Sequence, residues 1–166
     1  MSQTISGSPP YVAPYFYAQA FAGMLADSTD VKDVNTFACD INPIPFGVVV
    51  GRTAANSMKV GVGGTMPVGL SIHDHLIASR GQYNQYDAVS VLTRGRAWAL
   101  LDATTTGVLD GAPVYFVPAT GAASATATGN TAIPRAIFRS PPASVFNLLG
   151  GAAVNVAVIE FNYPML

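Results

Sequence analysis

The feature that most limits how this chain can fold is a succession of short, strand-like apolar runs separated by glycine, proline and asparagine. From Phe46 onward these runs are about four to eight residues long and recur roughly every ten residues. No amphipathic helical period is sustained between them. The pattern predicts an all-β fold, a small β-sandwich or β-barrel, with strands over 47–53, 58–62, 68–72, 88–93, 96–101, 113–117, 136–139 and 154–163.

Several of these runs are apolar on both faces. In the last one, over 154–163, the valines alternate with Ala157, Ile159 and Phe161, so neither face is polar. A strand of an antiparallel sheet that is buried on both faces needs a second covering layer. We therefore expect a second sheet or another subunit to lie over it.

The N-terminal part of the chain differs from the rest. Pro9, Pro10 and Pro14 fix φ and lack a backbone donor, which predicts an extended arm and not a central strand. Residues 18–26 are helix-forming and predict a possible short helix. The predicted organisation is an N-terminal arm over 1–45 and a β-sandwich or barrel domain over 46–166.

The composition limits the classes of function. Half of the residues are hydrophobic and 10% are charged, where a typical soluble domain has about 25% charged residues. The apolar runs are too short to cross a membrane, and the N-terminus lacks the basic residues of a signal peptide, so we expect a protein made in the cytoplasm with no membrane contact. Eight scattered Lys and Arg residues and a net charge of −1 argue against nucleic-acid binding. Sparse charge predicts that part of the surface is covered by other subunits.

The run VLTRGRAWALL, over 91–101, places two arginines around a glycine and contains the single tryptophan. Two interpretations compete, an anion site and a tight turn between two strands. We expect a two-residue hairpin turn at Arg94-Gly95, with glycine supplying a positive φ and the arginines solvated.

Candidate chemistry is sparse. His73 and His75, two apart, would share one face of a strand and chelate a metal if further ligands approached, but a polar strand end is the preferred interpretation. The glycines over 61–64 lack the lysine of a phosphate loop and predict a turn. Cys39 is the only cysteine and predicts a small buried residue. The sequence thus predicts no enzyme, no catalytic residue, no metal and no cofactor.

Three stretches resemble the structural cement, or head-decoration, proteins of tailed bacteriophages. They are AVSVLTRGRAWALL (88–101), GAPVYFVPATGAASATATGNTAIPRAIF (111–138) and PFGVVVGR (45–52), which carry packing and turn motifs. The resemblance runs from Phe46 to the C-terminus and leaves the N-terminal 45 residues unmatched.

The resemblance implies a small all-β virion protein on the outer surface of the capsid. Its partner would be the major capsid protein, and it would stabilise the head against internal DNA pressure as a homotrimer, or alternatively a dimer. Capsid or intersubunit contacts are expected from Tyr11, Tyr15, Phe16 and Tyr17 in the arm and from Trp98 in the body.

Two other functions remain open at this stage. One is a carbohydrate-binding β-sandwich module on the virion surface, in which Tyr83, Tyr86 and Trp98 would stack on sugars. The other is a metal-dependent hydrolase that would use His73, Asp74 and His75.

Overall fold

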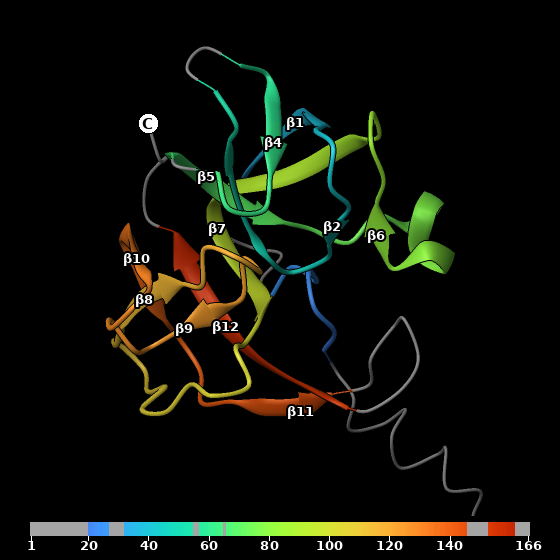
Figure 1. Cartoon of the computed structure of the whole chain (residues 1–166). Helices are drawn as coiled ribbons and strands as arrows, with labels where there is room; N and C mark the ends of the chain where they lie inside the picture. Colours follow the sequence, from blue (N-terminus) through green and yellow to red (C-terminus); the bar gives the residue numbers. More distant parts are fainter. Residues whose placement is uncertain (1–19, 27–31, 55–56, 65, 146–152, 162–166) are drawn as a thin grey trace, which may run out of the picture.

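The fold was obtained as a computed structural model, which describes residues 20–26, 32–54, 57–64, 66–145 and 153–161 (Figure 1). The chain is all-β, as the sequence predicted, and consists of a closed barrel with further strands beside it. One short 3-10 helix, η1 (His75–Arg80), interrupts the strands, and no helix of the described ranges has the length and apolarity to cross a membrane. The strands are β1 (Asp33–Cys39), β2 (Ile44–Pro45), β3 (Val49–Arg52), β4 (Lys59–Gly61), β5 (Met66–Ser71), β6 (Gln82–Tyr83), β7 (Ala88–Leu100), β8 (Pro113–Phe116), β9 (Ala123–Ser124), β10 (Thr131–Phe138), β11 (Ala143–Val145) and β12 (Val154–Phe161).

The barrel is formed by β1, β4, β3, β5 and β7, and it closes because β7 also pairs with β1. Only the β1–β4 pair in this barrel is parallel, and the other pairs are antiparallel. Alternate side chains of a strand point to opposite faces, so every second residue faces the barrel interior. The buried interior contains Phe37, Cys39, Ile44, Phe46, Val48, Val50, Val60, Val68, Tyr83, Val89 and Val91.

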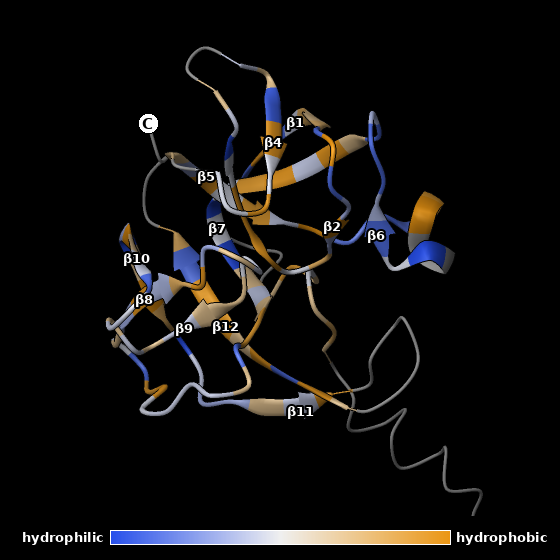
Figure 2. Ribbon diagram, in the orientation of Figure 1, coloured by the Kyte–Doolittle hydropathy of each residue, from blue (hydrophilic) through white to orange (hydrophobic). Residues whose placement is uncertain are grey.

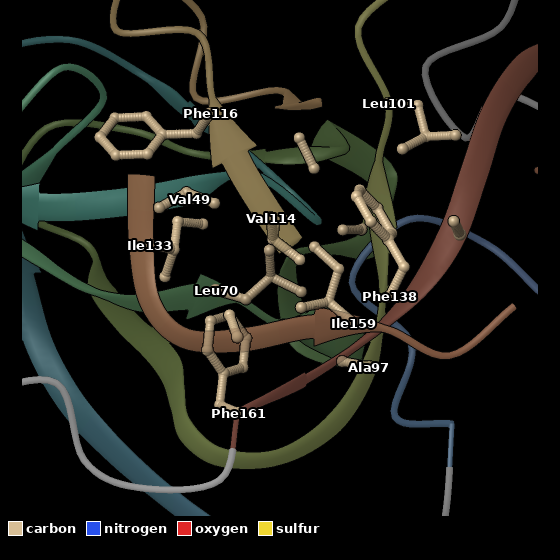
Figure 3. Close-up of a cluster of buried hydrophobic side chains, with 14 of the residues drawn as sticks. Val49, Leu70, Ala97, Leu101, Val114, Phe116, Ile133, Phe138, Ile159 and Phe161 are labelled. Carbon is tan, nitrogen blue, oxygen red and sulfur yellow. The ribbon is translucent and has the colours of Figure 1, made fainter. Parts of the chain in front are cut away.

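A second layer continues from the distal half of β7. There β7 pairs with β12, and the order runs on through β10, β8 and β9, while β11 pairs with β12. Val49 of β3 and Leu70 of β5 point outward from the barrel. They form one buried core between the two layers with Phe138 of β10 and Phe161 of β12 (Figure 3). Hydrophobic residues therefore run along most of β12 (Figure 2). The sequence predicted that β12, apolar on both faces, needs a second covering layer, and this layer comes from the same chain.

The predicted hairpin turn at Arg94-Gly95 is wrong. β7 continues through both residues, and Gly95, with a φ of 119°, bends the strand. Arg94 is paired with Asp33 of β1, whereas Arg96 is paired with Glu160 of β12. The two halves of β7 therefore have different partners and are not paired with each other. The positive φ of Gly95 was expected, but it allows β7 to bend so that the strand belongs to the barrel before Gly95 and to the second layer after it.

The predicted boundary at residue 45 also differs from the structure. β1 and β2 both lie before it, and β1 is an integral strand of the barrel. Residues 20–26, expected in a possible short helix, form a turn and an isolated bridge between Leu25 and Ala97. The N–H of Gly23 donates to the Trp98 carbonyl at 2.7 Å, and its carbonyl accepts from the His73 N–H at 2.9 Å. Small residues are used here because Gly23 lies against the backbone of Gly47, where a Cβ would be 3.0 Å from the amide nitrogen.

The small, polar segment over 119–132 contains a buried strand. Gly121 follows the first turn, and Ala123 and Ser124 of β9 pair with β8. All three are buried. A Cβ on Gly121 would lie 2.5 Å from the carbonyl oxygen of Val49, so the small residues permit close packing on the barrel.

Candidate functional site

The aromatic contact residues predicted from the sequence divide into two groups. Tyr11, Tyr15, Phe16 and Tyr17 lie outside the described residues. Trp98 is half-buried on β7, where it packs beside Ala20, Val145 and Val156. Its contact with another subunit stays a prediction.

The three rings named for sugar binding do not form one exposed platform. Tyr83 is fully buried, and its hydroxyl donates to the Ile72 carbonyl at 2.7 Å. Burial of this hydroxyl raises its pKa despite opposing hydrogen bonds at Ser90. Tyr86 precedes the first residue of β7, whereas Trp98 lies near the last. The geometry thus removes Tyr83 from any surface site.

His73 and His75 line an apolar groove. Their ring centroids are 4.8 Å apart, and the His73 ring also makes edge contacts with Phe21 at 4.7 Å and Phe46 at 4.9 Å. Burial lowers the pKa of His73, the neighbouring His75 lowers it further, and Asp74 opposes the change. The groove has a volume of about 400 Å³ and is lined by Phe21, Gly23, Met24, Leu25, Ile72, His73 and His75.

The hydrolase alternative requires more metal ligands than this groove supplies. In the part of the chain that the structure describes, no three or more His, Cys, Asp or Glu side chains are close enough to hold one metal ion. Cys39 is buried at the barrel core, as predicted, and burial raises the pKa of its thiol.

A second candidate surface lies at the barrel end where β1 terminates. Ile41, Met58 and Tyr86 are 70%, 64% and 73% exposed, and we call these three residues the Tyr86 patch. The Tyr86 amide donates to the Cys39 carbonyl, and the Lys59 amine lies 6.0 Å from the Tyr86 ring centroid. Met58 also lies beside the end of β1, because its carbonyl accepts from the Ala38 amide at 3.0 Å. Large exposed apolar side chains around one strand end, on a protein of low charge, indicate a contact surface.

Tyr86 is held in a strained conformation. Its φ of 68° is in the left-handed region, which a bulky residue rarely adopts. The turn is fixed because the Asp87 carboxylate accepts from the Asn84 amide at 2.8 Å and from Arg80 at 3.1 Å. Such strain at an exposed aromatic residue is typical of functional positions. The sequence indicated Tyr86 only as an aromatic residue, because the positive φ comes from the turn and its partners.

The outer face of the second layer carries a charged network. Arg96 donates from Nε to Oε2 of Glu160 at 3.1 Å, and Arg139 Nε donates to the same oxygen. Arg139 also approaches Asp110 at 3.5 Å. Burial alone would raise the pKa of Glu160, but the hydrogen bonds and charges of Arg139 and Arg96 outweigh it and hold that pKa below its ordinary value.

This network predicts a pH dependence of stability. Because the folded pKa of Glu160 is lowered, its contribution is complete above the unfolded value near 4.5 and is lost as pH falls through the folded pKa. Glu160→Gln should lower the free energy of unfolding by about 1–2 kcal/mol at neutral pH, with a smaller difference in acid. Urea unfolding over a pH series measures this. Asp110→Asn, at an exposed carboxylate, is the control and should cost less than about 0.5 kcal/mol. A Glu160→Gln deficit that is independent of pH would contradict the assignment.

Comparisons with known proteins agree with this fold. The family model described as structural cement protein (E217 gp24/Pam3 gp6) matches residues 10–162, so the likeness covers part of the N-terminal region that the sequence motifs left unmatched. Among the solved structures that match is a chain from "The capsid of Myoviridae Phage XM1", with a TM-score of 0.63 and 19% identity over 85% of this chain and 89% of that chain. At this identity the likeness shows the shared fold. No curated protein matches the sequence.

Proposed function

Because the chain belongs to the phage structural cement protein family, we propose that it binds between subunits of the major capsid protein and stabilises the head against the pressure of packaged DNA. The protein is a virion component of the outer capsid surface, with a structural role. We propose further that it has no enzymatic activity and assembles as a homotrimer. The observation that carries the proposal is the family match over residues 10–162.

The surface chemistry supports a protein that works through apolar contact. Only 10% of the residues are charged, and the exposed large hydrophobic side chains include the Tyr86 patch. Permanent protein interfaces are more apolar than ordinary surfaces, and their charged residues are depleted at the centre. Many copies on one shell also multiply a modest contact energy through multivalency.

The Tyr86 patch is the proposed contact with the shell. Its aromatic ring is exposed, and the hydrogen-bonded turn holds the backbone in one conformation before binding. A rigid aromatic anchor loses little conformational entropy on association, which is a property of binding hot spots. Tyr11, Tyr15, Phe16 and Tyr17 in the arm, and Trp98, are proposed as additional intersubunit or capsid contacts.

Co-sedimentation with purified phage heads that lack the protein tests the function. We expect saturable binding at a fixed ratio to the major capsid protein that persists after a salt wash. Retention of only a few copies per head would contradict the cement function.

Tyr86→Ala should reduce head occupancy at a limiting protein concentration roughly tenfold or more, because it truncates the proposed anchor. Leu109→Ala is the matched control, since Leu109 is 66% exposed but lies in the loop before β8. Equal binding of the Tyr86→Ala and unmodified proteins would rule out the Tyr86 patch as the anchor while leaving the cement function open to the first assay.

A further inference from the structure

The apolar groove beside His73 has walls fixed by backbone hydrogen bonds. Phe21, Gly23 and Met24 form one side, and Gly23 is bonded both to Trp98 and to His73. Ile72 and His73, which follow β5, form the other side. A Cβ on Gly23 would lie 2.8 Å from the His73 amide nitrogen, so the two sides meet at backbone contact. The groove is therefore preformed and does not depend on a ligand for its shape.

The size and lining of the groove favour aromatic side chains. Its volume of about 400 Å³ is at the small end of the range for ligand pockets, which suits a short peptide segment. The His73 imidazole already meets the Phe21 ring and the Phe46 ring edge to face, with centroids 4.7 Å and 4.9 Å away. Aromatic rings prefer this geometry, and imidazole nitrogens can exchange hydrogen bonds with tyrosine hydroxyl groups.

The chain contains such a segment next to the groove in sequence. Nineteen residues precede Ala20, and Tyr15, Phe16 and Tyr17 lie close to the point where the described chain begins. A chain of this length can span up to about 60 Å when extended. It is therefore long enough to contact an adjacent subunit.

The packing around Ala20 favours a groove on another copy. Ala20 and Ala22 pack with Trp98, Val145 and Val156, on the side of β11 and β12, whereas Phe21 faces His73. The Ala20 side chain is therefore buried on the side of Trp98, away from the groove that the Phe21 ring lines. To enter its own groove, Tyr17 would need a reversal within three residues, directly before a buried alanine. Binding of Tyr17 in the groove of a neighbouring copy requires no such reversal of the chain.

We propose that the aromatic segment Tyr15-Phe16-Tyr17 of one copy binds in the groove lined by Phe21, Met24, Ile72, His73 and His75 of a neighbouring copy. This inference deepens the proposed function, because it assigns a binding site to the arm contacts proposed there. The arm thereby joins the copies of the oligomer, while the Tyr86 patch remains free for the shell.

Paired cysteines in the full-length protein test the exchange. The native Cys39 is fully buried, so introduced thiols are the reactive ones. Two variants of different mass, one carrying Ala18→Cys and the other Met24→Cys, are co-expressed, purified together and oxidised, so that all three rings of the segment are kept. We expect a disulfide that joins the two different chains. An Ala18→Cys and Leu109→Cys pair is the control and should give no such product, because Leu109 lies in the loop before β8.

A single chain with both Ala18→Cys and Met24→Cys separates the alternatives. Covalent multimers on a non-reducing gel support exchange between copies, whereas an internal disulfide in a monomer overturns it in favour of the chain's own groove. No disulfide of either kind overturns the groove as the arm's site. The assay contains no heads, so its failure leaves the head-binding result intact and the two proposals are judged separately.

A second measurement uses no introduced thiols. Phe16→Ala should weaken association between copies roughly tenfold or more in sedimentation equilibrium, because it removes the central ring of the segment. Thr4→Ala, in the same N-terminal region, is the control and should leave association unchanged. An unchanged association constant for Phe16→Ala would overturn the proposal.

Discussion

Gly69→Ala should be the most destabilising of the substitutions considered, with an expected loss of about 3 kcal/mol or more in the free energy of unfolding. A Cβ at this position in β5 would lie 2.1 Å from the carbonyl oxygen of Leu92 and 2.8 Å from Cγ1 of Val91. Leu92 cannot move away easily, because it is paired with Leu70 on one side and with Val34 on the other. The contact can therefore be relieved only by opening the barrel.

The loss can be measured by urea and thermal unfolding of the full-length protein. For a domain of this size, about 3 kcal/mol corresponds to a fall in Tm of about 10 °C. Gly129→Ala is the matched control, since Gly129 has a φ of 77° but no atom within 4 Å of an added Cβ. It should cost about 1 kcal/mol, from backbone strain alone. Equal losses for the two variants would show that steric contact at Gly69 is unimportant.

Gly95→Val should be the second largest change, with a loss of about 2–3 kcal/mol. Gly95 has a φ of 119° at the bend of β7, which a β-branched residue adopts only with strain. An added Cβ would also lie 3.2 Å from the Cβ of Lys32. If β7 straightened to relieve the strain, its distal half would lose register with β12, where Ala97 pairs with Ile159.

Ala88→Val on the same strand is the control for Gly95→Val. Ala88 is exposed in the regular part of β7, where a β-branched residue fits the pleat and should change stability by less than about 0.5 kcal/mol. Urea unfolding compares the two variants. A Gly95→Val protein as stable as the Ala88→Val protein would mean that the bend does not need glycine.

The positions of most barrel strands could be predicted from the sequence. The runs predicted over 47–53, 58–62 and 68–72 contain β3, β4 and most of β5. This succeeded because the apolar pattern of a strand is local and the glycines between the runs end them. β1 was missed because three exposed residues in succession, Val34, Asn35 and Thr36, hide the alternation and because the prolines earlier in the chain indicated an arm. The buried β9 was missed for a related reason, because small residues carry no apolar signal even where close packing requires them.

The candidate sites were less accessible to sequence reasoning. Tyr86 and His73 were named as residues, but their surroundings come from distant segments. Cys39 supplies the carbonyl that holds the Tyr86 turn, and Phe21 supplies the ring that faces His73. These contacts depend on how segments about fifty residues apart are brought together.

The sequence by itself determined the all-β class, the positions of several strands, the low charge that favours assembly and the positive φ of Gly95. Only the tertiary structure decided that β7 is one bent strand shared by a barrel and a second layer, that residues 20–26 belong to the body, and that Tyr86 is strained and exposed. The physical reason is that strand propensity depends on a residue and its near neighbours, whereas pairing partners, bends and grooves depend on backbone groups that meet across the chain. Arg94-Gly95 has the local chemistry of a turn, but Arg94 pairs with Asp33 and Gly95 with Phe161, and these separate partners make it part of a continuous strand.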